Sequence, residues 1–259
     1  MTETAWPEPA PGAAPMPRMI GAQAGLELRT LARNGEQLLL TLIIPVLLLV
    51  VFSSEALISV GPGPRIGFIA PGILALAVMS TSFTSLAIGT AFERRYGVLK
   101  RLGATPLSRG GLISAKAATV LVVEAGQVVL ITVVSALLGW APVVTPVSVL
   151  SALLLIIAGS AAFSGLAMLM AGTLRAEATL AAANLVYLVL LGVGGVVFPL
   201  SKFPASARPL LRALPSGAMS DGLRSVLRYG SGFPARDLLV LVIWAVAGLA
   251  LAARFFRWE

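Results

Sequence analysis

The sequence predicts an all-α integral membrane protein with six transmembrane helices, and both its composition and its apolar stretches support this. Of the 259 residues, 58% are hydrophobic and 12% are charged, with a mean hydropathy of +0.94. A soluble domain is roughly 45–50% apolar and about 25% charged. Because too few polar side chains are present to cover a surface in water, a soluble globular enzyme is excluded.

Six apolar stretches approach the length of about 20 residues that a helix needs to cross a bilayer. The expected spans are residues 37–54, 69–91, 117–138, 147–171, 178–198 and 238–253. Pro45 interrupts the first span, which neighbouring helices can accommodate. The last span is short. An even number of spans places both termini on the same side of the membrane.

The region before the first span divides into two parts. Residues 1–18 contain five prolines and are expected to form a disordered cytoplasmic tail. Residues 19–36 alternate apolar and charged side chains, which predicts an amphipathic helix lying along the membrane surface. The alternative is an ordinary helical lead-in to the first span.

Basic residues near the span ends indicate the orientation. With the N-terminus inside, 12 of the 19 lysine and arginine residues fall on the cytoplasmic side and seven outside. Positive charge favours the cytoplasmic side, so both termini are expected on the cytoplasmic side of a bacterial inner or plasma membrane. Residues 199–237 hold six of the seven external charges. Their apolar residues recur at helical spacing between prolines, which predicts two short amphipathic helices, half buried at the outer face.

Several kinds of chemistry are absent from the sequence. There is no cysteine and no histidine, which excludes disulfides, thiol nucleophiles, imidazole bases and the usual zinc or haem sites. No Gly-Lys pair occurs, so there is no phosphate-binding P-loop. We therefore expect no catalytic residue, metal or cofactor in this chain. The net charge of +8 reflects orientation and anionic lipid rather than nucleic acid.

Polar residues inside predicted spans are the candidates for a translocation route. Glu124 lies deep in the third span, and Gln127 follows on the same helical face. These two side chains mark either a substrate or proton site, or a hydrogen-bonded contact that locks helices together. Asn184 in the fifth span is a further candidate for the route or for helix packing. A face suited to close helix approach is formed by small residues of the fourth span: Gly159, Ser160, Ser164 and Gly165.

The loop between the second and third spans is the most specific stretch. It continues the second span as a charged helix, which Gly103 and Pro106 are expected to interrupt. Val98, Leu99 and Leu102 could dock into a groove on a partner whose acidic rim meets the arginines. The alternative is a positively charged anchor on the inner membrane face.

Residues 93–108 follow the pattern Glu-Arg-x-x-Gly-x-Leu-x-x-Leu-x-x-Thr-Pro-x-Ser. Here the sequence resembles the permease subunit of type-2 ABC transporters, in the branch of antibiotic and multidrug exporters. Ile69-Ala70-Pro71-Gly72-Ile73 is similar to the family's Pro-Gly start of span two. Leu214-Pro215, followed by Asp221-Gly222-Leu223-Arg224, is similar to its signature before the last span. Arg95 and Lys100 stand where the family often has acids.

The resemblance implies that residues 19–259 form a type-2 ABC transmembrane domain. It also implies a second permease subunit, identical or related, and two separate ATPase subunits that bind ATP and Mg. The chain would provide the route for a hydrophobic or amphipathic substrate: a drug or antibiotic, a lipid or a lipid-linked glycan. The residues expected to couple it to the ATPase are Glu93, Arg94, Arg95, Lys100 and Arg101, with Arg29 and Arg33 as further candidates.

Two other functions fit parts of the sequence. One is a secondary transporter that uses Glu124 as a proton site, although inverted repeats are not evident. The other is a membrane factor without transport activity, such as an immunity or assembly protein, which would tolerate replacement of the charges in the loop after the second span.

Overall fold

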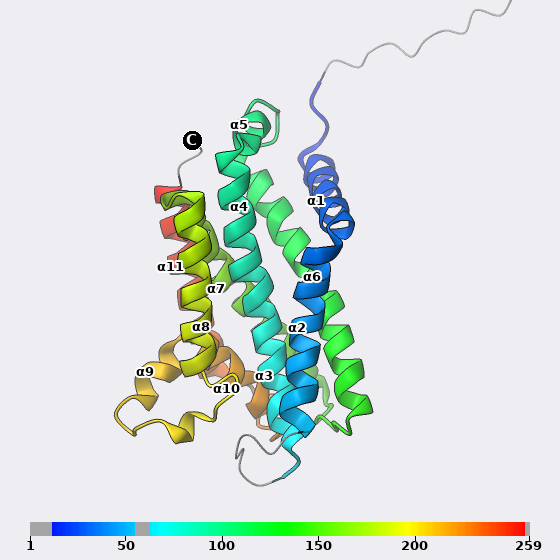
Figure 1. Ribbon diagram of the computed structural model, residues 1–259, viewed down its shortest axis with the longest axis vertical. Helices are drawn as coiled ribbons and strands as arrows, with labels where there is room; N and C mark the ends of the chain where they lie inside the picture. The colour runs from blue at the N-terminus through cyan, green and yellow to red at the C-terminus, as the bar shows by residue number, and fades with distance from the viewer. Residues whose placement is uncertain (1–11, 55–62, 257–259) are drawn as a thin grey trace, which may run out of the picture.

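The computed structural model describes residues 12–54 and 63–256, and this part of the chain folds into helices without a strand. The long helices stand side by side as a bundle, with α1 and α5 at one end and α9 and α10 at the other (Figure 1). In chain order the elements are α1 (Met16–Arg33), α2 (Gly35–Ser54), α3 (Arg65–Met79), the π-helix η1 (Ser80–Ser85), α4 (Leu86–Arg95), α5 (Val98–Gly103), α6 (Arg109–Leu137), α7 (Pro146–Thr173), α8 (Ala176–Val193), η2 (Leu200–Lys202), α9 (Arg208–Ala213), α10 (Pro215–Leu227) and α11 (Ala235–Phe255).

The all-α membrane fold is confirmed. Five of the six predicted spans correspond to helices long and apolar enough to cross a membrane: Arg65–Arg95, Gly110–Leu137, Pro146–Thr173, Ala176–Val193 and Ala235–Phe255. The first predicted span, residues 37–54, lies within α2, and Thr41–Ser54 of this helix is apolar. The amphipathic helix α1 begins at Met16, three residues before its predicted start. The first part of the predicted proline-rich tail, residues 1–11, lies outside the described residues.

The second span contains a π-helical segment that the sequence analysis did not predict. Residues 80–85 carry a run of hydroxyl side chains, and the Ser82 hydroxyl donates to the Val78 carbonyl at 2.6 Å. Bonds of this kind compete with the regular helix ladder. Single π turns inside α-helices recur at functional sites. The segment lies at the depth where Glu124 approaches the span, beside Ser82.

The predicted small-residue face of the fourth span is a packing surface. A Cβ atom at Gly165 would lie 2.7 Å from the backbone nitrogen of Leu249, so α7 and α11 approach here with almost no side chain between them. A Cβ at Gly159 would lie 2.7 Å from the sulfur of Met219 in α10. Glycine at position 165 lets two helix backbones come together, as in other membrane bundles, and glycine at position 159 leaves room for the Met219 side chain.

The two short helices expected before the last span are present, but α10 is not half buried at the surface. It packs against α3, α7 and α11, and Met219, Leu223 and Val226 are completely buried. The reason is that its small residues on the other faces, including Ser216, Gly217 and Ser220, are buried too. The helix is therefore an internal element that fills one end of the bundle (Figure 1).

Candidate coupling site and polar residues of the bundle

The predicted coupling motif folds into a short helical hairpin that projects from one end of the bundle (Figure 1). Gly97 has a φ of 70°, which glycine adopts without strain and which turns the chain between α4 and α5. Leu99 is completely buried and holds α5 against the bundle. Leu99 therefore does not belong to a surface that docks into a partner. Ser108, at the end of the motif, caps α6 by accepting from the Gly111 backbone N–H at 3.1 Å.

Three of the predicted coupling residues bind other parts of the same chain. Glu93 forms an ion pair with Lys116 of α6 at 2.7 Å. Arg94 donates to the Leu174 carbonyl, and Arg95 forms an ion pair with Glu177 of α8. The end of α4 is thereby attached to α6 and to the connection between α7 and α8.

The other predicted coupling residues face outward. Lys100 and Arg101 are exposed on α5, and Arg29 and Arg33 are exposed on α1. The structure therefore divides the predicted set into residues at the end of α4 that contact neighbouring helices, among which Arg95 and its partner Glu177 are both exposed, and an exposed basic group on α5 and α1.

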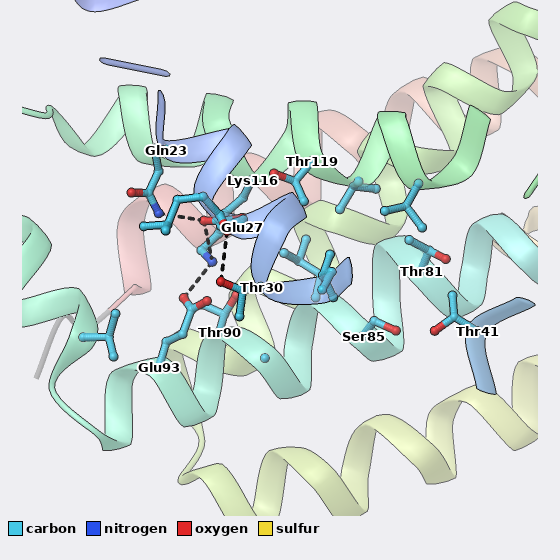
Figure 2. A pocket seen from close by; sticks show the side chains of 17 residues that line it. Gln23, Glu27, Thr30, Thr41, Thr81, Ser85, Thr90, Glu93, Lys116 and Thr119 are labelled. Carbon is cyan, nitrogen blue, oxygen red and sulfur yellow. Dashed lines mark hydrogen bonds and ion pairs between the residues drawn. The ribbon is translucent and has the colours of Figure 1, made fainter. Parts of the chain in front are cut away.

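Lys116 is the residue of this region that sequence reasoning missed. It directly precedes the third predicted span, residues 117–138, where a basic residue is expected to face the cytoplasm, yet only 5% of its side chain is exposed. Its ammonium group lies 3.3 Å from Glu27 of α1 and 2.7 Å from Glu93 of α4 (Figure 2). A lysine is almost never buried without a partner, so these ion pairs bring together α1, α4 and α6. The signal in the sequence was a single lysine among alanines at the start of an apolar helix.

The two polar residues of the third span share a buried face. Only 1% of Glu124 is exposed, and it lies against Ser82 of η1 and Ser160 of α7. Neither of its carboxyl oxygens forms a hydrogen bond of normal geometry within the described part of the chain. Gln127 accepts from the Thr81 hydroxyl at 2.9 Å and donates to the Thr41 carbonyl at 3.0 Å. Gln127 therefore joins α6 to η1 and α2, whereas Glu124 keeps unused bonding capacity.

Asn184 is not part of this buried group. It lies on the exposed face of α8, and its side-chain amide donates to the Leu180 carbonyl of the same helix at 2.9 Å.

At the opposite end of the bundle, Arg224 of α10 is buried against backbone carbonyls. Its guanidinium donates to the carbonyls of Phe68 at 3.1 Å, Gly195 at 2.5 Å and Val196 at 2.6 Å. It also lies 3.7 Å from the centre of the Phe68 ring. Burial lowers the pKa of Arg224 to about 9, an effect that Asp221 opposes. The side chain is therefore still a cation at neutral pH.

The carbonyls that Arg224 binds are available because α8 ends early. The fifth span was predicted to reach Phe198, but the helix stops at Val193 and Gly195 has a φ of +69°. Gly72 of α3 completes the contact, because any Cβ there would collide with the Val196 carbonyl and the Arg224 guanidinium. The Pro-Gly and Asp-Gly-Leu-Arg stretches, far apart in sequence, thus meet at one place.

A comparison with protein families connects these features. The sequence model of a family described as ABC-2 family transporter protein matches residues 65–254. The chain belongs to this family. No curated protein matches it. This ABC-2 permease subunit is a multi-pass membrane protein, and the matched residues run from the start of α3 into the last turn of α11. They include the coupling motif, Lys116, Gly72 and Arg224, whereas α1 and α2 precede the match.

Proposed function

We propose that this ABC-2 permease is the membrane-spanning subunit of an ATP-driven exporter and provides the route for a hydrophobic or amphipathic substrate. Membership of the family implies an ATPase partner in general. The observation that carries the proposal is the α4–α5 hairpin, which is exposed at its tip and attached to several spans at its base. A drug or antibiotic, a lipid and a lipid-linked glycan are the substrate classes that an apolar route suits, because apolar contacts select weakly between them.

The tip of the hairpin has the composition of a protein-binding surface. Tyr96 is 64% exposed and Val98 is 37% exposed, and the basic residues Lys100 and Arg101 lie beside them. Interfaces are enriched in aromatic residues and arginine, and complementary charge directs the encounter of two proteins. We infer that the ATPase offers an acidic groove to this tip, with Arg29 and Arg33 of α1 at its edge.

The base of the hairpin transmits force to the spans. Glu93 connects it to α6, Arg94 to the end of α7, and Arg95 to α8. Ion pairs and hydrogen bonds at one helix end make α4 move together with its neighbours. Movement of the ATPase during its nucleotide cycle would then displace three spans at once. ATP and Mg bind to the ATPase, and this chain supplies the mechanical connection.

A second permease subunit, identical or related, would complete the complex and bring a second ATPase. The exposed face of α8 is suited to this contact. Asn184 lies there among Leu185, 63% exposed, and Leu188, 60% exposed. An amide gains more from a partner helix than from lipid tails, which offer no hydrogen bonds. In such a dimer Asn184 would face the boundary between the subunits, where a translocation route can form.

The proposed orientation places α1, α5 and the end of α11 on the cytoplasmic side of a bacterial inner or plasma membrane. These elements lie at one end of the bundle (Figure 1). Exposed basic residues gather at the same end, among them Arg29, Arg33, Lys100 and Arg101, with Arg254 in the last turn of α11. The positive-inside rule supports this orientation, which leaves both termini cytoplasmic and α10 near the outer face.

Transport driven by protons is the second candidate function. Glu124 favours it, because this carboxyl group is buried, forms no hydrogen bond of normal geometry within the described residues and lies beside the π-helical segment. Ionisable groups inside a membrane are often proton sites. Such a transporter would work without an ATPase and would stop when Glu124 is replaced by glutamine. A membrane factor without transport activity is the third candidate and would need neither the ATPase nor Glu124.

The test is a mild-detergent purification of the tagged full chain from its native membrane, with ATPase activity measured on the eluate. We expect a stoichiometric, vanadate-sensitive ATPase. The double variant Lys100→Glu, Arg101→Glu should reduce its recovery about tenfold or more, as expected when two charged contacts of an interface are reversed.

The matched control is Lys202→Glu, Arg236→Glu, which reverses two exposed basic residues at the opposite end of the bundle and should leave recovery unchanged. A folded eluate without ATPase would reject the proposal. Equal loss in both double variants would reject the assignment of the tip as the docking surface.

A further inference from the structure

A cavity of about 360 Å³ lies between α1, the start of α2, η1, α4 and α6. Ligand pockets in proteins range from about 300 to 1,000 Å³, so this cavity is large enough for one small molecule or one short hydrocarbon chain. In Figure 2, Glu27, Glu93 and Lys116 lie at one end, and Thr41 and Thr81 lie at the other. The cavity is thus elongated and has two chemically different ends.

The charged end carries an excess of negative charge. Among the described residues that line the cavity, the charged ones are Glu27, Glu93 and Lys116, which sum to one negative charge. The Lys116 side chain is 5% exposed and already bound to both carboxylates. The side chains of Glu27 and Glu93 remain 16% and 30% exposed, and a carboxylate has about four acceptor positions. Glu27 also accepts from the Gln23 side-chain amide at 3.0 Å, and the acceptor positions that remain on the two carboxylates leave capacity for one further cationic donor.

The rest of the cavity is apolar despite its many threonines, because their hydroxyl groups are already bound. Thr30 donates to the Leu26 carbonyl at 2.9 Å, and Thr119 donates to the Ala115 carbonyl at 3.0 Å. Thr81 donates to Gln127 at 2.9 Å. Threonines bound in this way can present their methyl groups to a ligand. The remaining lining is largely aliphatic: Leu26, Leu31, Leu86, Val98, Val120 and Val123.

We propose that this cavity binds an amphiphile with a single cationic ammonium head and one short hydrocarbon tail. The head lies between Glu27 and Glu93, and the tail runs along α6 toward Thr81. A phosphate on the ligand would add negative charge to an end that already has an excess, so a zwitterionic phospholipid is disfavoured. The binding involves only this chain and does not depend on the proposed coupling to an ATPase.

The test is photolabelling of the purified full chain in a non-ionic detergent. The probe is decylammonium with a diazirine in its tail, and labelled positions are mapped by mass spectrometry. We expect saturable labelling in α4 and α6, with competition by unlabelled decylammonium. Decanol, decanoate and lysophosphatidylethanolamine should compete at least tenfold less well. Equal competition by any of these three would overturn the proposed selection for a cationic head.

Substitutions in the cavity separate this site from general partition into the detergent. Glu93→Gln should weaken labelling about tenfold, as expected for a lost hydrogen bond between charged groups. The control Glu177→Gln, which removes a carboxylate at the same end of the bundle but outside the cavity, should not change it. Equal weakening in both variants would overturn the assignment of the head site.

Gly89 allows a second, independent test. A Cβ at Gly89 meets no other atom within 4 Å, and the residue lines the cavity. Gly89→Phe, or the smaller Gly89→Leu, should fill the cavity and abolish saturable labelling. The control Gly126→Phe also has open space around it but lies outside the lining residues. Unchanged labelling in folded Gly89→Phe and Gly89→Leu variants would overturn the proposal, whether or not an ATPase co-purifies.

Discussion

Replacement of Arg224 tests whether the end of the bundle near α10 is held by this one side chain. The guanidinium connects three segments that are distant in sequence, through the carbonyls of Phe68, Gly195 and Val196. Arg224→Ala removes all three hydrogen bonds and leaves the three carbonyls buried. Arg224→Lys keeps the charge but presents a single nitrogen, which cannot reach three carbonyls in the planar arrangement of a guanidinium.

The magnitude follows from these contacts. A hydrogen bond that involves a charged group contributes about 1.5–3 kcal/mol, so three of them represent roughly 5–9 kcal/mol before the cost of burying the cation is subtracted. That cost is several kcal/mol per ion. We therefore expect Arg224→Ala to lower the free energy of unfolding by about 3 kcal/mol, with Arg224→Lys between this variant and the wild type.

The assay is thermal unfolding of the purified chain in detergent, followed by the fluorescence of its tryptophans and by loss of the monodisperse peak in size exclusion. Lys202→Ala is the control, because Lys202 is exposed in η2 at the same end of the bundle. We expect no change for the control. If Arg224→Ala unfolded at the same temperature as Lys202→Ala, or if lysine fully replaced arginine, the view of Arg224 as a three-carbonyl clamp would be wrong.

Three further predictions concern single residues. Gly72→Ala should lower the free energy of unfolding by about 2 kcal/mol, because the added Cβ collides with the Val196 carbonyl. The same thermal unfolding assay measures this, and unchanged stability would contradict it. Lys116→Met should cost about 3 kcal/mol, because it leaves two carboxylates close together without a counter-charge, and stability restored by also changing both acids to glutamine would support this cause. Glu124→Gln should change stability by less than about 1 kcal/mol, since no hydrogen bond to the described residues is lost, and it should keep transport if the ATP-driven mechanism is right. Loss of transport with the ATPase still bound would indicate a role for the carboxyl group.

Much of the helical architecture follows from local sequence. The apolar stretches are long enough to require helices in a bilayer, because lipid offers no partner for backbone groups. Prolines and glycines set several ends, as Pro146 does for α7 and Gly97 does between α4 and α5. The pattern from Glu93 to Ser108 also identified the family, because its charged and turn-forming residues stand close together in the chain.

The roles of individual polar residues depended on tertiary structure. Lys116 and Glu27 are ordinary charged residues in their own helices, and only the packing of α1 on α6 turns them into a buried ion pair. The helix that carries Arg224 was predicted to be half buried at the surface, but insertion of α10 between other helices buries Arg224 against carbonyls released at the end of α8. Asn184 is a candidate for the route or for helix packing from its place in the fifth span, and only the tertiary structure places it on the exposed face of α8.

The sequence by itself determined that this chain spans the membrane as helices, that these 259 residues contain no P-loop, and that they carry the family's motif. These properties depend on composition and on neighbours along the chain. The tertiary structure alone decided which charged residues contact other helices and where the elongated cavity lies. Both depend on which helix faces pack together. Helical periodicity in the sequence predicts an apolar face, but it does not predict which helix packs against that face.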